Sequence, residues 1–222
     1  MTQDILIYEE KVLFIVQEYL NKNRYFTIEK IVPFINVRLK KFSINLNYAG
    51  IKEILKTLIK KKDILERSKL TREDILNNPN REKIFNTIKD NPGIYFNRLA
   101  RKLNLSNYIL AWHIKMLSNF NYIRSSYFEK HEAFFEADLK TENDELLFFV
   151  SKEKSKQLID FLINNQEGAT KTKLSRELRM HSSTVSNYVN KLEKYGILLK
   201  KKLPNKTIYF INERYYYDIQ RC

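Results

Sequence analysis

Apolar residues recur at every third or fourth position along most of the chain, and this spacing predicts a mainly helical protein. The clearest stretch contains Leu99 and Leu103, followed by Leu110, Ile114 and Leu117. Ser106 stands just before the second group, where a serine oxygen accepts hydrogen bonds from the free backbone N–H groups of a helix start. The pattern therefore predicts two consecutive helices joined by a tight turn.

The same pattern returns 75 residues later without a gap. This shift places Gly93 on Gly168, Leu99 on Leu174, Leu103 on Leu178, Leu110 on Val185, Ile114 on Val189, Leu117 on Leu192 and Ile123 on Leu198. Ser182 or Ser183 is expected to cap the later helix. One helix is expected before each copy, at 81–90 and 152–165, and one β-hairpin after it, at 122–135 and 197–211.

A third, divergent copy is predicted at the N-terminus, with helices at 8–23, 27–39 and 47–62. Its last helix matches the central copy at a shift of 59, and its hairpin is expected to be short or absent. Thr71 and Asp74 have the spacing of a capping box, which predicts a short helix after them. The segment 77–80 breaks the periodicity and 140–145 is polar, so the domains are expected at 1–76, 77–140 and 141–222.

Two segments carry a family resemblance. The first runs from Asn91-Pro92-Gly93 through Leu99-Ala100-Arg101-Lys102-Leu103 to Ala111–Leu117, and the second combines Leu174–Leu178 with Ser182–Leu198. Both resemble archaeal winged helix-turn-helix transcriptional regulators of the ArsR/MarR-like class. The resemblance implies a mainly α fold with small β-hairpin wings (α+β), built as tandem winged helix-turn-helix domains. Asn121 departs from the glycine usual before the wing, where this chain later has Gly196, but asparagine tolerates a left-handed backbone.

The resemblance implies duplex-DNA binding, with the third helix of each unit in the major groove. If the apolar face of this helix is buried, the helical wheel turns another set of side chains outward to read bases. These are Asn107, Tyr108, Ala111, Trp112 and Lys115 in the central copy, and Ser182, Ser183, Ser186, Asn187 and Asn190 in the last. Asparagine suits adenine, and arginine, the usual partner of guanine, is missing from both sets. We therefore expect AT-rich sites, read substantially through DNA shape.

Phosphate contacts are expected from basic residues on the second helix and the wing. The candidates are Arg98, Arg101, Lys102, Lys173, Arg176, Lys200, Lys201, Lys202 and Lys206. The last four make the most concentrated basic hairpin of the chain, whose alternative role is an edge strand protected by lysines.

Charge agrees with a polyanionic partner. The chain has 40 Lys and Arg against 26 Asp and Glu, a formal net charge of +14. The excess is spread evenly over the three segments, with 15 basic and 10 acidic residues, then 10 and 6, then 15 and 10. Such a balance favours nucleic acid first, an anionic membrane surface second and an acidic protein third, although AT-rich coding also favours lysine.

The residues that enzymes, metal sites, disulfide-bonded proteins and membrane proteins need are not recognisable in this sequence. No nucleophile with a base, paired carboxylates or metal cluster is recognisable, so neither an enzyme nor a cofactor is expected. The histidines at 113, 131 and 181 have no partners at ligand spacing, so no metal is expected. The lone cysteine, Cys222, makes no internal disulfide, which fits a reducing cytosol. The first 20 residues resemble neither a signal nor a transit peptide, and no apolar run reaches a membrane span, so a cytoplasmic, nucleoid-associated protein is expected.

Some alternatives stay open from the sequence. Trp112 either reads the DNA surface or packs, His113 is expected to pack, and Tyr215–Tyr217 either form a dimer contact or cover the last hairpin. Tandem winged helices also serve as protein-interaction scaffolds, as in ESCRT-II-like or RNA-polymerase-associated subunits, and a general chromatin or transcription factor is also basic. The N-terminal copy is expected to support the readers, through a homodimer or the transcription machinery.

Overall fold

The computed structural model describes residues 2–221, with side chains from 7 to 219. Cys222, on which the disulfide expectation rests, lies outside the described residues. The chain divides into two compact units, one made of 1–85 with 108–122 and the other of 86–107 with 123–222. The division into domains 1–76, 77–140 and 141–222 stays a prediction.

The order of elements repeats helices followed by hairpins along the chain. The elements are α1 (Thr2–Lys22), α2 (Ile28–Lys41), α3 (Tyr48–Lys61), α4 (Arg72–Ile75), α5 (Pro79–Lys89), β1 (Ile94–Tyr95), α6 (Phe96–Leu103), α7 (Asn107–Asn119), β2 (Ile123–Phe128), β3 (His131–Glu136), η1 (Thr141–Asn143), α8 (Asp144–Ser151), α9 (Glu153–Ile163), α10 (Lys171–Glu177), α11 (Ser182–Lys194), β4 (Leu198–Leu203), β5 (Lys206–Ile211) and α12 (Glu213–Arg221). This order confirms the predicted fold class, mainly α with small β-hairpin wings in tandem winged-helix units.

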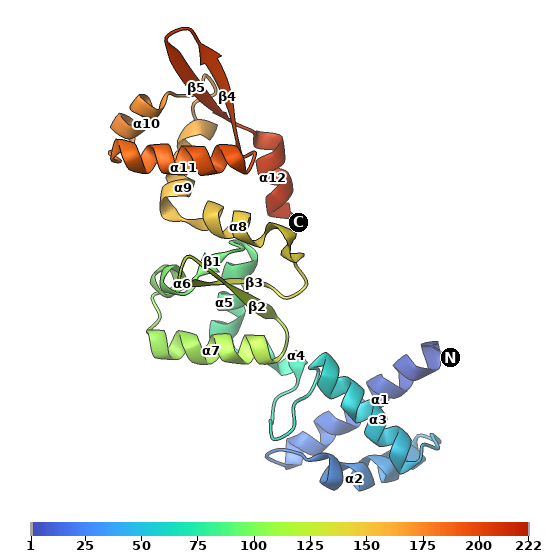
Figure 1. The fold of residues 1–222 in the computed structure, drawn as a ribbon. Coiled ribbons are helices and arrows are strands. Elements are labelled where there is room, and N and C mark those ends of the chain that lie inside the picture. Colours follow the sequence, from blue (N-terminus) through green and yellow to red (C-terminus); the bar gives the residue numbers. More distant parts are fainter. Residues whose placement is uncertain (1, 222) are drawn as a thin grey trace. The chain divides into compact units, whose positions relative to one another are not determined.

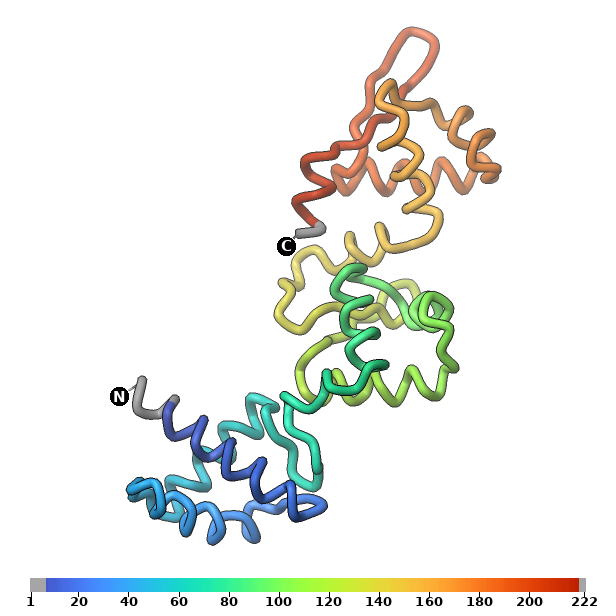
Figure 2. Tube along the Cα trace, turned by 180° about the vertical axis from the view of Figure 1, so that it is seen from behind, coloured from blue at the N-terminus to red at the C-terminus, as the bar shows by residue number. Residues whose placement is uncertain are grey.

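The first three helices, in the blue part of the tube in Figure 2, pack around an apolar core. Ile15, Ile35 and Leu55 are among the side chains that are fully buried there, one from each helix. After α3 the hairpin is reduced to one isolated bridge between Ile64 and Thr71, and Thr71 with Asp74 forms the predicted capping box at α4. This copy therefore has the helices of the unit without a full wing, as the sequence predicts.

The third helix of every copy ends in the same backbone turn. Lys62, Asn121 and Gly196 follow α3, α7 and α11 with φ of 63°, 57° and 76°. The next residue in each case bonds back into the helix, as Tyr122 N–H does to the Leu117 carbonyl at 2.9 Å. The positive φ at Asn121 confirms that asparagine adopts here the conformation that glycine adopts in the last copy.

The turn between the second and third helices also repeats. Asn104 and Arg179 stand 75 residues apart with φ of 52° and 49°. Leu105 N–H donates to the Ala100 carbonyl and Met180 N–H to the Ser175 carbonyl, both at 3.1 Å. The internal repeat is therefore a repeat of backbone geometry as well as of apolar positions.

Each hairpin belongs to a small antiparallel sheet. β2 and β3 pair from Ile123↔Glu136 to Phe128↔His131, and β1 adds a third strand beside β3. β4 and β5 pair from Leu198↔Ile211 to Leu203↔Lys206, and Ala169 makes an isolated bridge to Tyr209 where β1 would lie. The two hairpins were predicted, whereas β1 was not, because two residues are too short for an alternating pattern.

The polar stretch at 140–145, where the sequence places the last domain boundary, is followed by a buried helix. Residues 141–143 form η1, and α8 follows directly, with Leu146–Val150 buried without interruption. Leu147 and Phe148 pack with Ala133 and Phe135 of β3, while their neighbours pack with the core of α9–α11. Residues 146–150 of this helix are apolar on every side because two clusters cover them, so they show none of the one-sided periodicity that marks a surface helix.

Two smaller expectations near the C-terminus also change. The N-cap of α11 is His181, whose Nδ1 accepts from Ser183 N–H, so neither Ser182 nor Ser183 caps this helix. Tyr215–Tyr217 belong to α12, which the sequence reading missed. Tyr216 is buried in the core of the last copy, and Tyr215 and Tyr217 are exposed.

Candidate nucleic-acid interface

The outward face of α7 is the one the helical wheel predicts. Leu110, Ile114 and Leu117 are buried. All five candidate readers of this helix are exposed, namely Asn107, Tyr108, Ala111, Trp112 and Lys115, and Tyr108 is the most exposed, with 84% of its surface free. The helix therefore presents a mixed polar and aromatic surface with one positive charge.

A buried arginine lies behind that surface. Arg81 of α5 donates from Nε to the Ile75 carbonyl at 2.6 Å, and its guanidinium carbon lies 6.0 Å from the centre of the Trp112 ring. His113 beside it is buried, as expected, and its Nδ1 has no hydrogen-bond partner among the described residues. Burial, and then the positive charge of Arg81, lower the pKa of His113. Trp112 is thus half-exposed, with Arg81 beside its ring, so it has features of both alternatives, packing and reading of the DNA surface.

The outward face of α11 is polar and uncharged over its first two turns. Ser182, Ser183, Asn187 and Asn190 are exposed, whereas Ser186 is half-buried. Ser183 Oγ lies 2.7 Å from His181 Nδ1, and Lys171 Nζ donates to Asn190 Oδ1 at 2.6 Å. Asn187 has no such bond among the described side chains, so its amide is the freest of the set to reach a base edge.

The last hairpin projects beyond the helices of its unit in both views (Figure 1, Figure 2). Its four candidate lysines, Lys200, Lys201, Lys202 and Lys206, are all exposed. Lys200 pairs with Glu193, whose carboxylate raises the pKa of this lysine through a hydrogen bond. Within the described part of the chain the other three form no ion pair, so their charges face solvent.

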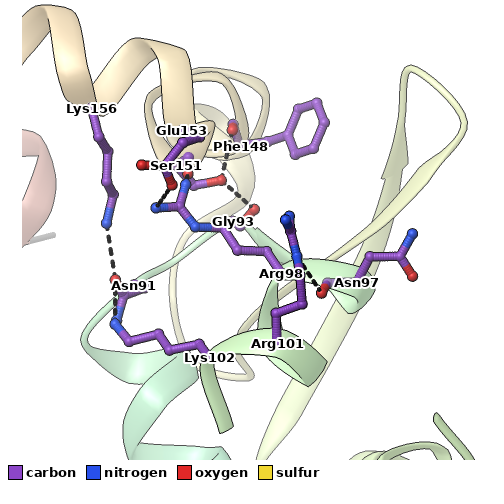
Figure 3. Close-up of polar contacts among 10 residues, drawn as sticks. All are labelled: Asn91, Gly93, Asn97, Arg98, Arg101, Lys102, Phe148, Ser151, Glu153 and Lys156. Atoms are coloured by element: carbon purple, nitrogen blue, oxygen red, sulfur yellow. Dashed lines mark hydrogen bonds and ion pairs between the residues drawn. The ribbon is translucent and has the colours of Figure 1, made fainter. Parts of the chain in front are cut away.

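The candidates on α6 and α10 have different surroundings. Arg101 is exposed and makes one long bond of 3.4 Å to the Asn97 carbonyl, and Arg176 pairs with the adjacent Glu177 at 2.8 Å. Lys173 lies 6.0 Å from the ring centre of Phe161. Arg98 differs, because its guanidinium donates to the Ser151 carbonyl and pairs with Glu153 at 2.9 Å (Figure 3). Its charge is used inside the unit, so we withdraw Arg98 from the phosphate-binding set.

The hairpin β2–β3 has an anchored tip. Glu129 and Lys130 form the turn, with φ of 47° and 67°. The carboxylate of Glu129 accepts hydrogen bonds from Lys152 and, at 2.8 Å, from Lys191 of α11. These two ammonium groups lower the pKa of Glu129 to about 2. This hairpin is therefore fixed to the last copy, in contrast to the projecting β4–β5.

A group of cations gathers around Asn91, in the turn before β1. Lys102 Nζ of α6 and Lys156 Nζ of α9 both donate to Asn91 Oδ1, at 3.2 and 2.9 Å (Figure 3). Lys156 is half-buried, and burial, then the positive charges of Arg98 and Lys102, lower its pKa, against smaller opposite effects of Asp160 and Glu153. Two positive side chains thus converge on one neutral oxygen.

Similarity to known proteins is partial. The chain is 32% identical over 144 residues to an uncharacterized HTH-type transcriptional regulator of Methanocaldococcus jannaschii, an alignment that covers 65% of this chain and 36% of that relative. No family model matches. Two structures of the endosomal ESCRT-II complex each contain a chain that aligns over 96% and 95% of this one, with 12% and 11% identity and a TM-score of 0.26 in both cases, covering 92% and 91% of those chains. A TM-score of 0.26 is too low to establish a shared arrangement.

Two kinds of site were also sought in the described residues. None of the helices described is long and apolar enough to cross a membrane. Across the same residues, no three side chains of His, Cys, Asp or Glu gather in a way that could hold a metal ion.

Sequence reasoning missed Lys156 and Asn91. A signal for Lys156 was present, since the shift of 75 that aligns the last two copies places it on Arg81. Both are cations on the first helix of a copy, and both have most of their length packed against protein. Asn91 gave no signal, because an Asn-Pro-Gly sequence indicates only a turn.

Proposed function

We propose that this chain is a transcription regulator that binds duplex DNA, with the last copy making the strongest contact. The observation that carries the proposal is the β4–β5 hairpin, which projects from its unit with four exposed lysines. Phosphate contacts by lysine and arginine supply most of the affinity of proteins for DNA. Lys201, Lys202 and Lys206 form no ion pair among the described residues, so they can contact a phosphate without giving up an internal partner.

Base reading is assigned to the outward faces of α7 and α11. Their exposed amides and hydroxyls suit adenine and mixed base edges, and arginine is absent from both faces. We therefore expect AT-rich promoter sites, recognised in part through the shape of the duplex. Such a regulator acts on the nucleoid without catalysis.

The similarity to an archaeal HTH-type transcriptional regulator supports the general class. Because the alignment spans about a third of that relative, its other parts say nothing about this chain. The ArsR/MarR-like subtype rests on the sequence motifs alone.

The N-terminal copy is assigned a supporting role, as a homodimer contact or a contact with the transcription machinery. It lacks a full wing, and it exposes large apolar side chains, among them Phe14, Val37 and Tyr48. Exposed apolar surface of this kind favours protein contact over DNA contact. Replacement of Phe14 and Val37 by Gln, which changes no charge, should change the oligomeric state or partner binding and leave duplex affinity unchanged.

The test is selection from a random duplex library at two salt concentrations. The variant changes Lys200, Lys201, Lys202 and Lys206 to Ala, and the matched control changes the exposed Lys30, Lys40, Lys52 and Lys60 of the N-terminal copy to Ala. Both remove four charges. We expect one enriched motif. The slope of log affinity against log salt should fall by about 3 in the wing variant, since each phosphate contact contributes about 0.9 and Lys200 is already paired with Glu193. The control should fall much less.

The other outcomes separate the alternatives. Binding that depends on salt but enriches no motif indicates a general chromatin or transcription factor. No binding to any duplex overturns the proposal in favour of a protein-interaction scaffold. Equal effects of the two variants would mean that net charge alone, and not the wing, attracts the DNA.

A further inference from the structure

The cations around Asn91 are incompletely neutralised. Among the described side chains, neither Lys102 nor Lys156 forms an ion pair, and the carboxylate of Glu153 nearby is already paired with Arg98 at 2.9 Å. The two ammonium nitrogens lie within about 6 Å of one another, the most that bonds of 3.2 and 2.9 Å to one oxygen allow. Two like charges at this distance repel each other, and a neutral amide oxygen offsets only part of the repulsion.

The repulsion acts on Lys156, whose side chain is partly enclosed by protein. Lys156 is half-buried, and Figure 3 shows it extending from α9 toward Asn91, with Lys102 approaching the same residue from α6. Arg98 fixes α6 to the start of α9 through Ser151 and Glu153, so both lysines come from elements that are held together. The packing of α6 against the start of α9 therefore brings the exposed Lys102 to the half-buried Lys156.

The unused donors match a phosphate group. Each ammonium group has three N–H donors and uses one for Asn91 Oδ1, which leaves two donors on each lysine. Asn91 Nδ2 donates to the Thr87 carbonyl at 3.0 Å, which fixes the amide with its oxygen toward the lysines. An oxyanion placed between the two lysines would accept from both and replace their repulsion by attraction.

We propose that Lys102, Lys156 and Asn91 form a phosphate site, and that a backbone phosphate of duplex DNA fills it. The first statement stands on the geometry, and the second rests on the proposed function. Arg101 lies on the same helix as Lys102 and is exposed, so the DNA backbone would pass along α6 to the first helix of the last copy. One phosphate would then be shared between the central and the last copy.

The DNA test uses the full chain and the variants K102Q, K156Q and the double variant. The control is K154Q, which removes an exposed charge two residues away on α9. Each single variant should lower the slope of log affinity against log salt by about 0.9, the value for one phosphate. The double variant should lower it by about the same amount, because both lysines hold one phosphate, and K154Q should leave the slope unchanged. A loss of about 1.8 in the double variant overturns the shared site.

A second arm tests the site without DNA. The side-chain NMR signals of Lys102 and Lys156 are followed in the full chain during titration with inorganic phosphate, against chloride at equal ionic strength. We expect a saturable shift of both signals, a rise in the pKa of Lys156, and loss of the Lys102 shift in K156Q. The thermal midpoint of K156Q shows that the variant folds.

The two arms fail in different ways. A saturable phosphate shift with unchanged DNA slopes overturns the assignment to DNA and gives the site to a free phosphate. No saturable shift, together with slopes equal to that of K154Q, overturns the site itself. If the full chain binds no duplex, the proposed function fails, and the phosphate titration alone decides the site.

Discussion

Arg98 and Arg101 stand three residues apart on α6 and have opposite surroundings. The guanidinium of Arg98 is tied to Ser151 and Glu153, whereas that of Arg101 is exposed with one bond of 3.4 Å. Moving Arg98 to a phosphate would leave the Ser151 carbonyl and the Glu153 carboxylate without their donor, which costs more than an exposed contact returns. The partners of a charged residue, and not its position on the helix, decide whether it is available to DNA.

Glu129 gives the clearest pH dependence of the chain. Its pKa is lowered to about 2 from an ordinary value of 4.5 by Lys152 and Lys191. A lowered folded-state pKa means stability that is fully present above the unfolded value and is lost as the pH falls toward the folded one. The ion pairs of Glu129 therefore stabilise the protein above about pH 5 and lose this effect between pH 5 and pH 2.

The variant E129Q should lower the free energy of unfolding at pH 7 by about 1 kcal/mol. The figure is small because 46% of the carboxylate side chain is exposed and solvent screens its pairs. The difference from the unmodified chain should shrink below pH 4.5, measured by urea denaturation at pH 7, 4 and 3. E142Q, at an exposed carboxylate of η1, is the control. A difference that stays constant down to pH 3 would show that the charge of Glu129 is not responsible.

At the scale of elements, the helices that the sequence predicts are those with one buried face. α7 and α11 place an apolar residue toward one core at each turn, so their periodicity is visible in the sequence. Leu146–Val150 of α8 are all buried, so they show no one-sided period, and β1 has only two residues. Among its described side chains α12 buries only Tyr216 and Ile219, and its run of three tyrosines hides this short period. Elements whose environment comes from two cores, or from one neighbour strand, cannot be predicted from their own pattern.

The candidate site divides in the same way. Outward direction on a helix follows from the apolar face, and the exposed candidates of α7 and α11 were predicted by it. The helical pattern does not predict which charged side chains already have a partner inside the protein. Arg98 meets Glu153, and Lys156 meets Asn91, only after the helices pack. Residues more than 50 positions apart in the chain determine these contacts.

The turn before β1 depends on the lack of a side chain at Gly93. Its φ is +81°, and a Cβ there would lie 2.5 Å from the backbone nitrogen of Phe148 in α8. Gly93→Ala should therefore lower the free energy of unfolding by about 3 kcal/mol or more, from left-handed strain of about 1–2 kcal/mol and a clash with rigid backbone. Urea denaturation measures it.

Two other glycines calibrate this prediction. Gly196→Ala has a φ of +76° but its Cβ would only touch the Tyr215 ring at 3.5 Å, so about 1 kcal/mol is expected. Gly50→Ala, in α3 with its nearest neighbour at 3.4 Å, should stabilise the helix by about 0.5–1 kcal/mol. If Gly93→Ala lowers the free energy of unfolding no more than Gly196→Ala does, then α8 shifts to make room for the added methyl group and is not held rigidly against this turn.

For the whole molecule, the net charge of +14 attracts any duplex, whatever its sequence. Affinity for a single duplex therefore says little about base reading. The ratio of affinities for two duplexes of equal length and different composition removes this term, because both offer the same number of phosphates. That ratio depends only on base edges and on DNA shape.

An AT-rich duplex should compete for the full chain at least about tenfold better than a GC-rich one, a difference of about 1.4 kcal/mol. One or two asparagine contacts to adenine are sufficient, since each discriminates by about 1–3 kcal/mol. Electrophoretic competition at fixed salt measures the ratio.

Variants of α11 then separate base reading from charge. Asn187→Ala should reduce the AT preference without changing the salt slope, because Asn187 is exposed and uncharged. Asn190→Ala should reduce it less, since Lys171 already occupies the Asn190 oxygen at 2.6 Å. Gln166→Ala, at an exposed amide after α9, should leave the ratio unchanged. Equal competition by the two duplexes would remove the AT-rich assignment, and any base reading would then have to come from a motif of mixed composition.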